Sequence, residues 1–162
     1  MKRSQLIALL VLIVAAIALV VLWPKPKLSD EDRIRHQVIQ MADAVRRKDT
    51  AEIMSHISER FRGSGQVATR DDLKRLLAAQ LVTGRWTRVF IKSMDPQVTS
   101  PDQATFTGKF IFTDAPTDRP EEIPSKGRIE AYELEGTLEK EADGEWRFVT
   151  GRYRTIPPGE LF

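Results

Sequence analysis

Two side chains of this sequence combine proton-transfer chemistry with apolar neighbours. His56 lies beside Ile53 and Ile57, at the edge of an expected apolar helix face, and is the best single candidate for a general base. A lone histidine in this setting is more often a surface or hydrogen-bonded residue. Tyr132 shares one face of an expected strand with Leu134, and as a core residue its hydroxyl needs only a hydrogen-bond partner. We therefore predict no catalytic residue.

The motifs of common catalytic centres are missing. His36 lies twenty positions before His56, and no cysteine or H-E-x-x-H motif completes a metal site. The chain has no G-x-S-x-G motif, and no glycine-rich loop follows a strand; Gly63 and Gly65 flank Ser64 but follow an expected helix. The sequence predicts neither a metal site nor a cofactor.

The N-terminus contains one long apolar segment, from Leu6 to Trp23. At about 1.5 Å per helical residue it reaches roughly 27 Å, close to the thickness of a bilayer core. A cleaved signal peptide is the alternative, but the apolar run is longer than usual and no small-residue cleavage site follows it. We predict a short tail (1–5), a transmembrane signal anchor (6–23) and a linker (24–28).

The orientation of this anchor follows from the tail that precedes it. Basic residues flank the apolar segment on both sides, so their count does not decide the topology. A very short charged tail normally stays in the cytoplasm, and a long downstream domain crosses regardless of its charge. We expect a single-pass protein of the inner (plasma) membrane whose domain is periplasmic or extracellular. The lack of cysteine is compatible with export.

The charge of the chain excludes one class of partner and suggests another. The net charge of +2 is accounted for by Lys2 and Arg3, so the rest is neutral and we predict no nucleic-acid binding. Residues 33–92 contain 13 basic and 6 acidic side chains, whereas residues 93–162 contain 8 and 14. This asymmetry indicates either two halves that pair with each other or a surface that orients a protein partner or a second copy.

Three helix-start signals occupy the first half of the domain, at Ser29, at Asp49 to Glu52 and at Thr69. Apolar residues recur at helical spacing after each of them. Gly63 and Gly84 mark the ends of the second and third helices. The expected inward residues of the second helix are Ile53, Met54, Ile57 and Phe61.

The second half changes to the period of strands. Alternation predicts strands at about 86–98, 105–113, 132–139 and 146–156, joined as an antiparallel meander. The proline-rich and acidic segment from Asp114 to Lys126 is expected to be a flexible loop.

This α+β order resembles the NTF2-like (nuclear transport factor 2-like, cystatin-like) superfamily. The residues that carry the likeness are the first amphipathic helix, the segment KDTAEIMSHISERFRG and the hairpin DGEWRFVTGRYR. The resemblance implies a cone over residues 29–156, in which about four curved antiparallel strands wrap three helices, with a C-terminal tail (157–162).

The superfamily includes isomerases, dehydratases, transport adaptors and secretion scaffolds, so the fold alone does not supply a function. The resemblance makes five residues candidates for a pocket in the cone: His56, Trp86, Phe110, Tyr132 and Trp146. We expect a non-catalytic interaction or assembly module of the cell envelope, similar in layout to inner-membrane assembly factors of type IV secretion. The alternatives are an isomerase or dehydratase that uses the cone, and a binder of a small apolar ligand.

Overall fold

The computed structural model describes residues 28–157 and residue 160. The predicted tail, the predicted anchor and residues 24–27 of the linker lie outside the described residues. Within the described part, no helix is both long enough and apolar enough to cross a membrane. The membrane anchor therefore stays a prediction from the sequence.

Three helices begin where the capping residues predict. Helix α2 (Asp30–Arg47) begins after Ser29, whose hydroxyl accepts a 3.1 Å hydrogen bond from the amide of Asp32. Helix α3 (Thr50–Ser55) is capped by Asp49. Helix α4 (Arg70–Val82) begins with a capping box in which Thr69 and Asp72 satisfy each other's backbone amides.

The sheet has five strands in the order β1-β5-β4-β3-β2. Strands β2 (Arg88–Ser100), β3 (Gln103–Thr113), β4 (Ile129–Lys140) and β5 (Trp146–Thr155) form the predicted antiparallel meander. Register shifts interrupt the pairing of β2 with β3 and of β4 with β5, and Gly136 faces Gly151 across the latter pair. Bulges and glycines of this kind let a sheet curve around its helices.

The prediction that the second helix continues to Gly63 is wrong, because α3 ends at Ser55. Residues Ile57–Arg62 form strand β1, which pairs in parallel with β5 and adds a fifth strand to the expected four. The carbonyl of His56 accepts a 3.0 Å hydrogen bond from the amide of Phe148, which draws the chain into the sheet. Ile57 and Phe61 are buried as predicted, but from a strand.

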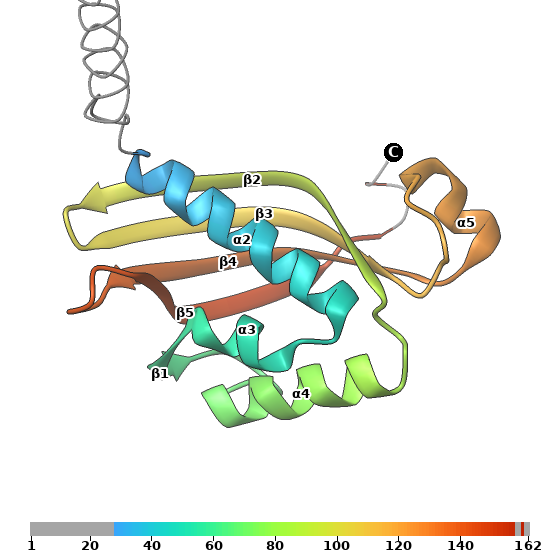
Figure 1. The fold of residues 1–162 in the computed structure, drawn as a ribbon, viewed down its shortest axis with the longest axis horizontal. Helices are drawn as coiled ribbons and strands as arrows, with labels where there is room; N and C mark the ends of the chain where they lie inside the picture. Colours follow the sequence, from blue (N-terminus) through green and yellow to red (C-terminus); the bar gives the residue numbers. More distant parts are fainter. Residues whose placement is uncertain (1–27, 158–159, 161–162) are drawn as a thin grey trace, which may run out of the picture.

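The segment between β3 and β4 is also more ordered than predicted. It forms a 3-10 turn, η1 (Pro120–Glu122), followed by a short helix, α5 (Ile123–Lys126). The side chain of Ile123 is fully buried and belongs to a small core with Ile111 and Ala131, on the sheet face opposite to Phe110 and Tyr132. Figure 1 shows α5 at one end of the sheet, away from the other helices.

Helices α2, α3 and α4 lie on the inner side of the curved sheet (Figure 1). One core cluster joins α3, β1 and α4 around Phe61 and Leu81, and a second joins α2 to the middle of the sheet around Ile34, Phe106 and Leu138. The two clusters share partly buried neighbours such as Phe112. The space between helices and sheet contains the cavity described below.

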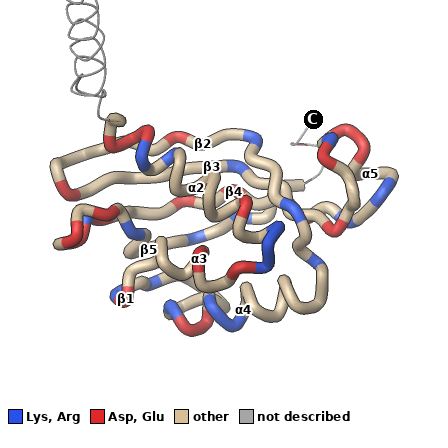
Figure 2. Tube along the Cα trace, viewed as in Figure 1, with Lys and Arg blue, Asp and Glu red and all other residues tan. Residues whose placement is uncertain are grey.

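Charges of both signs are interspersed along the folded chain, for example in α4 and around α5 (Figure 2). Several ion pairs join the basic half to the acidic half: Arg60 with Glu139 at 2.7 Å, and Arg88 with Asp118 at 3.0 Å. The charge asymmetry between the two halves of the sequence is thus partly neutralised by ion pairs within the fold.

Candidate functional site: an apolar cavity

A cavity of about 400 Å³ lies between the helices and the inner face of the sheet. Its walls come from α2, α3, β1, α4 and the four strands of the meander. Most of the lining is apolar, and it includes Val45, Ile57, Phe61, Leu77, Phe110 and Phe112. Phenylalanines of β3 therefore line the cone without filling it.

One wall is formed by the inward stripe of α4. Leu73, Leu76, Leu77 and Gln80 recur at helical spacing and all line the cavity. Gln80 thus places an amide at a position where the helical repeat of α4 predicts an apolar side chain. Its Oε1 is buried and, in the described part of the chain, has no hydrogen-bond partner.

A second wall is aromatic. The ring of Trp86 lies 4.5 Å from that of Phe112 and 6.4 Å from that of Tyr132, measured between centroids. Tyr132 in turn makes an edge contact with Tyr153 at 5.7 Å. Trp86 is buried and Tyr132 is half-buried, so the cluster offers a large, rigid and largely apolar contact surface.

Glu130 holds this aromatic wall in place. Its Oε2 accepts a 2.9 Å hydrogen bond from Nε1 of Trp86 and a 3.0 Å hydrogen bond from the hydroxyl of Tyr132. Burial, together with the hydrogen bond to this carboxylate, raises the pKa of Tyr132 to about 12. The phenol is consequently protonated at neutral pH and its proton is already shared with Glu130.

Sequence reasoning missed Glu130. A signal was present, because Glu130 shares the inward face of β4 with Tyr132 and Leu134, where a carboxylate needs a partner. The two donors that satisfy it are brought to it by different segments, and this pairing could not be read from local spacing.

The rim of the cavity is polar. Ser64 and Gln66 contribute from the turn between β1 and α4, and Glu135 and Arg152 contribute from β4 and β5, where they form an ion pair. The pairing of β1 with β5 ends at Thr150, so the rim lies where these two strands separate.

The structure places three of the five pocket candidates, Trp86, Phe110 and Tyr132, in the lining. The other two lie elsewhere. His56 ends α3, and its Nε2 lies 3.4 Å from Oε1 of Glu52, outside the lining. His36 and Asp43 are exposed on α2.

Trp146 lies in the second core cluster, at the start of the β5 strand. Its Nε1 donates a 3.1 Å hydrogen bond to Oδ1 of Asp30, and Nζ of Lys140 lies 4.9 Å from its ring centroid. Lys140 also pairs with Oδ2 of Asp30 at 2.7 Å, and this interaction lowers the pKa of the Asp30 carboxyl. Trp146 thus connects the start of α2 to the β4–β5 hairpin.

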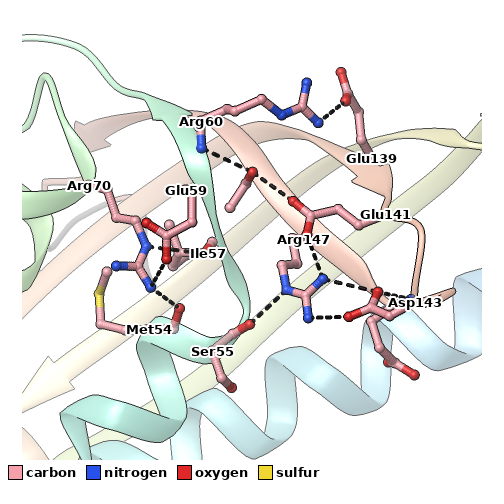
Figure 3. A network of polar contacts seen from close by, with 12 residues as sticks. Met54, Ser55, Ile57, Glu59, Arg60, Arg70, Glu139, Glu141, Asp143 and Arg147 are labelled. Carbon is pink, nitrogen blue, oxygen red and sulfur yellow. Dashed lines mark hydrogen bonds and ion pairs between the residues drawn. The ribbon is translucent and has the colours of Figure 1, made fainter.

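A polar network fixes β1 beside that hairpin (Figure 3). Arg147 donates to the carbonyl of Ser55 at 3.1 Å, to Glu141 at 2.6 Å and to Asp143 at 2.7 Å. Its guanidinium lowers the pKa of Asp143 to about 2. The buried hydroxyl of Ser58 donates to Glu141 at 2.8 Å. None of these residues lines the cavity.

Metal binding finds no support in the described residues, since no group of three or more His, Asp or Glu side chains there is placed to hold an ion. A comparison with protein-family models and with curated protein sequences finds no match.

Solved structures do share the fold. The chain is similar to a ketosteroid isomerase-like protein from Erwinia carotovora atroseptica, with a TM-score of 0.57 and 19% identity over 80% of this chain and 98% of that one. It is similar to a proposed dehydratase of the NTF2-like family from Streptomyces avermitilis, with a TM-score of 0.59 and 12% identity over 79% and 96%.

A third similar structure is a proposed calcium/calmodulin-dependent protein kinase II association domain from Xanthomonas campestris, with a TM-score of 0.61 and 14% identity over 82% and 92%. These likenesses show that the domain has the NTF2-like α+β fold, with helices packed on a curved five-stranded sheet. At such low identity they show the fold alone.

Proposed function

We propose that this protein binds an apolar small molecule in its cavity and does not transform it. The observation that carries the proposal is the cavity of about 400 Å³ with an aromatic wall. Small-molecule sites typically measure roughly 300 to 1,000 Å³ and are lined mainly by apolar and aromatic side chains with a few placed polar groups. The cavity fits this description in both size and chemistry.

The polar groups around the cavity favour binding over catalysis. Tyr132 is protonated and donates to Glu130, so it does not supply a base. The carboxylate of Glu135 at the rim is paired with Arg152. His56, the candidate general base, is outside the lining. A general base must reach the proton that it removes, and no lining group is placed and free to do so.

A cavity-filling variant tests this proposal. Ala42 lines the cavity from α2, so Ala42→Phe places a ring in the space that the ligand needs. Ala78 lies on the exposed side of α4, and Ala78→Phe is the matched control. We expect native mass spectrometry of gently extracted protein to show a copurifying apolar molecule on the native chain and on the control, and less of it on Ala42→Phe. An equal amount on all three proteins would contradict the proposal.

We also propose that residues 6–23 hold this domain at the inner membrane, with the domain outside the cytoplasm. The apolar length of the segment and the short charged tail before it support this topology. Protease added to spheroplasts, whose outer membrane has been opened, is expected to digest the domain. Protection of the domain until the membrane is permeabilised would reverse the topology.

The charge asymmetry of the sequence supports a second proposal, that the domain docks on another envelope protein or on a second copy of itself. Crosslinking in intact membranes is expected to recover a larger species. Recovery of monomer alone would count against it, and would leave ligand binding in the cavity unaffected.

A further inference from the structure

The second half of β5 has a free edge, which is the side of Tyr153–Thr155 that faces away from β4. Strand β1 pairs with β5 only as far as Thr150, whereas β5 continues to Thr155 (Figure 1). The amide of Ile156 donates to the carbonyl of Ala131, and bonded pairs alternate along an antiparallel ladder. The backbone groups of Tyr153 and Thr155 therefore point away from β4, beyond the end of β1. Within residues 28–157 and residue 160, no strand pairs with them.

The opposite edge of the sheet is protected against a further strand. Strand β2 contains Pro96, which has no amide to donate, and two register shifts interrupt its pairing. Helix α2 also packs against β2. Between Gly151 and Thr155, β5 has neither a proline nor a register shift. Its unpaired N–H and C=O groups therefore form a template for an added strand.

The side chains at the free edge alternate between two surfaces. Tyr153 is 44% exposed and lines the cavity at the rim. Arg152 and Arg154 project to the other face of the sheet, and their side chains are 72% and 58% exposed. Both use Nε and Nη2 to pair with Glu135 and Glu133 of β4, whereas Nη1 of Arg152 has no partner in the described part of the chain. A strand added here would meet basic groups on one face and an aromatic rim on the other.

We infer that the free edge of β5 binds an extended segment of a partner protein, in which acidic residues alternate with apolar ones. The inference rests on the proposed docking function and adds the surface and the chemistry of the partner. Backbone hydrogen bonds to Tyr153 and Thr155 hold the segment as a sixth, antiparallel strand. Its acidic side chains face Arg152 and Arg154, and its apolar side chain lies beside Tyr153 at the mouth of the cavity.

A second copy of this chain fits the free edge less well. Two β5 strands can pair antiparallel with either Tyr153 or Arg154 at the centre of symmetry. In the first case Arg152 lies opposite Arg154 of the second copy, and in the second case the two Arg154 side chains lie opposite each other. Like charges directly opposite destabilise a strand pair, whereas an acidic segment places opposite charges there.

The experiment uses the full chain in lipid nanodiscs and a short capped peptide of alternating glutamate and leucine. Two further peptides carry N-methyl groups, either on the leucines, whose amides face β5 in the antiparallel pairing, or on the glutamates, whose amides face away. Binding is measured by calorimetry, with empty nanodiscs as the control. Methylation of the leucines is expected to weaken binding roughly tenfold, as the loss of one or two backbone hydrogen bonds requires. Methylation of the glutamates is expected to leave the affinity unchanged.

A pair of protein variants tests the same contact from the other side. Tyr153→Pro removes the amide that faces the partner, and it takes no hydrogen bond from the β4 ladder because that amide points away from β4. Tyr153→Val also removes the ring but keeps the amide, so it is the matched control. We expect the peptide to bind Tyr153→Pro roughly fivefold to tenfold more weakly than Tyr153→Val. A peptide with glutamine in place of glutamate is expected to bind the native chain about threefold more weakly.

Each outcome bears on a different part of the inference. Equal binding of the two N-methylated peptides, or no binding of any peptide, would overturn the free edge as the docking site. Equal binding of the glutamate and glutamine peptides would overturn the acidic partner. Self-association of the chain that Tyr153→Pro abolishes and Tyr153→Val retains would assign the edge to a second copy instead. The docking function is tested separately by crosslinking, so a larger crosslinked species without peptide binding would leave docking standing at another surface.

Discussion

The hydroxyl of Tyr132 donates to Oε2 of Glu130 across 3.0 Å. Because the same oxygen accepts from the indole of Trp86, one carboxylate orients two rings that line the cavity. Carboxylates in an apolar setting are costly unless they are hydrogen-bonded, and here the two donors supply that compensation. Glu130 thus determines the shape of this cavity wall, because it fixes the positions of the Trp86 and Tyr132 rings.

This contact predicts how stability depends on alkaline pH. The pKa of Tyr132 is about 12 in the fold, above the value of roughly 10 for an unfolded tyrosine. The unfolded chain therefore loses its proton first, and stability falls as the pH rises from about 10 to about 12. In Tyr132→Phe this part of the fall is expected to be absent. Thermal unfolding of both proteins over this pH range measures the difference in stability between them. The titration of lysines affects both proteins equally and so cancels in this difference.

Removal of the Glu130 charge should lower the pKa of Tyr132. Glu130→Gln keeps an acceptor for Trp86 but takes away the negative charge that helps to raise the pKa of Tyr132. We expect the pKa of the phenol to move down toward its ordinary value, and stability to fall by about 1 kcal/mol. Ultraviolet titration of the tyrosinate, with Tyr132→Phe to identify its signal, tests this. An unchanged pKa would show that burial alone sets it.

Arg147 should be sensitive to exchange for lysine. Its guanidinium contacts Glu141, Asp143 and the carbonyl of Ser55, and its side chain is 22% exposed. Lysine keeps the charge but lacks the planar set of donors, so Arg147→Lys is expected to cost about 1 to 2 kcal/mol. Arg60→Lys is the control, because that side chain is 66% exposed and its pair with Glu139 is worth little. Urea denaturation of the two variants distinguishes them; equal losses would contradict the prediction.

The turn that contributes to the rim depends on Gly63. A Cβ at this position would lie 2.0 Å from the carbonyl oxygen of Val67, and the amide of Gly63 bonds to Ala68 within the same turn. Gly63→Ala should therefore cost about 2 kcal/mol or more and weaken ligand binding, since the turn also carries Gln66. Gly65→Ala meets only the strain of a φ of +63°, and is expected to cost about 1 kcal/mol without changing affinity.

The order of elements could be predicted because each carries its own local signal. The caps at Ser29 and Thr69 and the alternation in β3 and β4 act within a few residues. Strand β1 could not be predicted in this way, because Ile53, Ile57 and Phe61 fit a helical face as well as a strand. Its identity is decided by Phe148 and Glu141, which approach from the far end of the chain. Ile123 is a similar case, since its core partners are strand residues brought to it by the fold.

The cavity was predictable in kind but not in detail. The aromatic residues Trp86, Phe110 and Tyr132 were candidates because the sequence resembles the NTF2-like superfamily, and all three line the cavity. The polar residues Glu130 and Gln80 could not be found in this way. Each interrupts an apolar pattern, and its neighbours in space depend on how α4 and β4 pack. His56 does not line the cavity; it is the C-cap residue of α3, which ends earlier than the sequence indicated.

Asp30 has a mechanical consequence for the whole domain. It is the first residue of α2, and its two carboxylate oxygens contact Trp146 and Lys140 at the β4–β5 hairpin. Tension on the chain ahead of Leu28 would reach the sheet directly through this carboxylate, in addition to passing along the helix. Rupture of α2 from the sheet under load would then begin at Asp30, so Asp30→Asn should lower the unfolding force measured by pulling from the N-terminus.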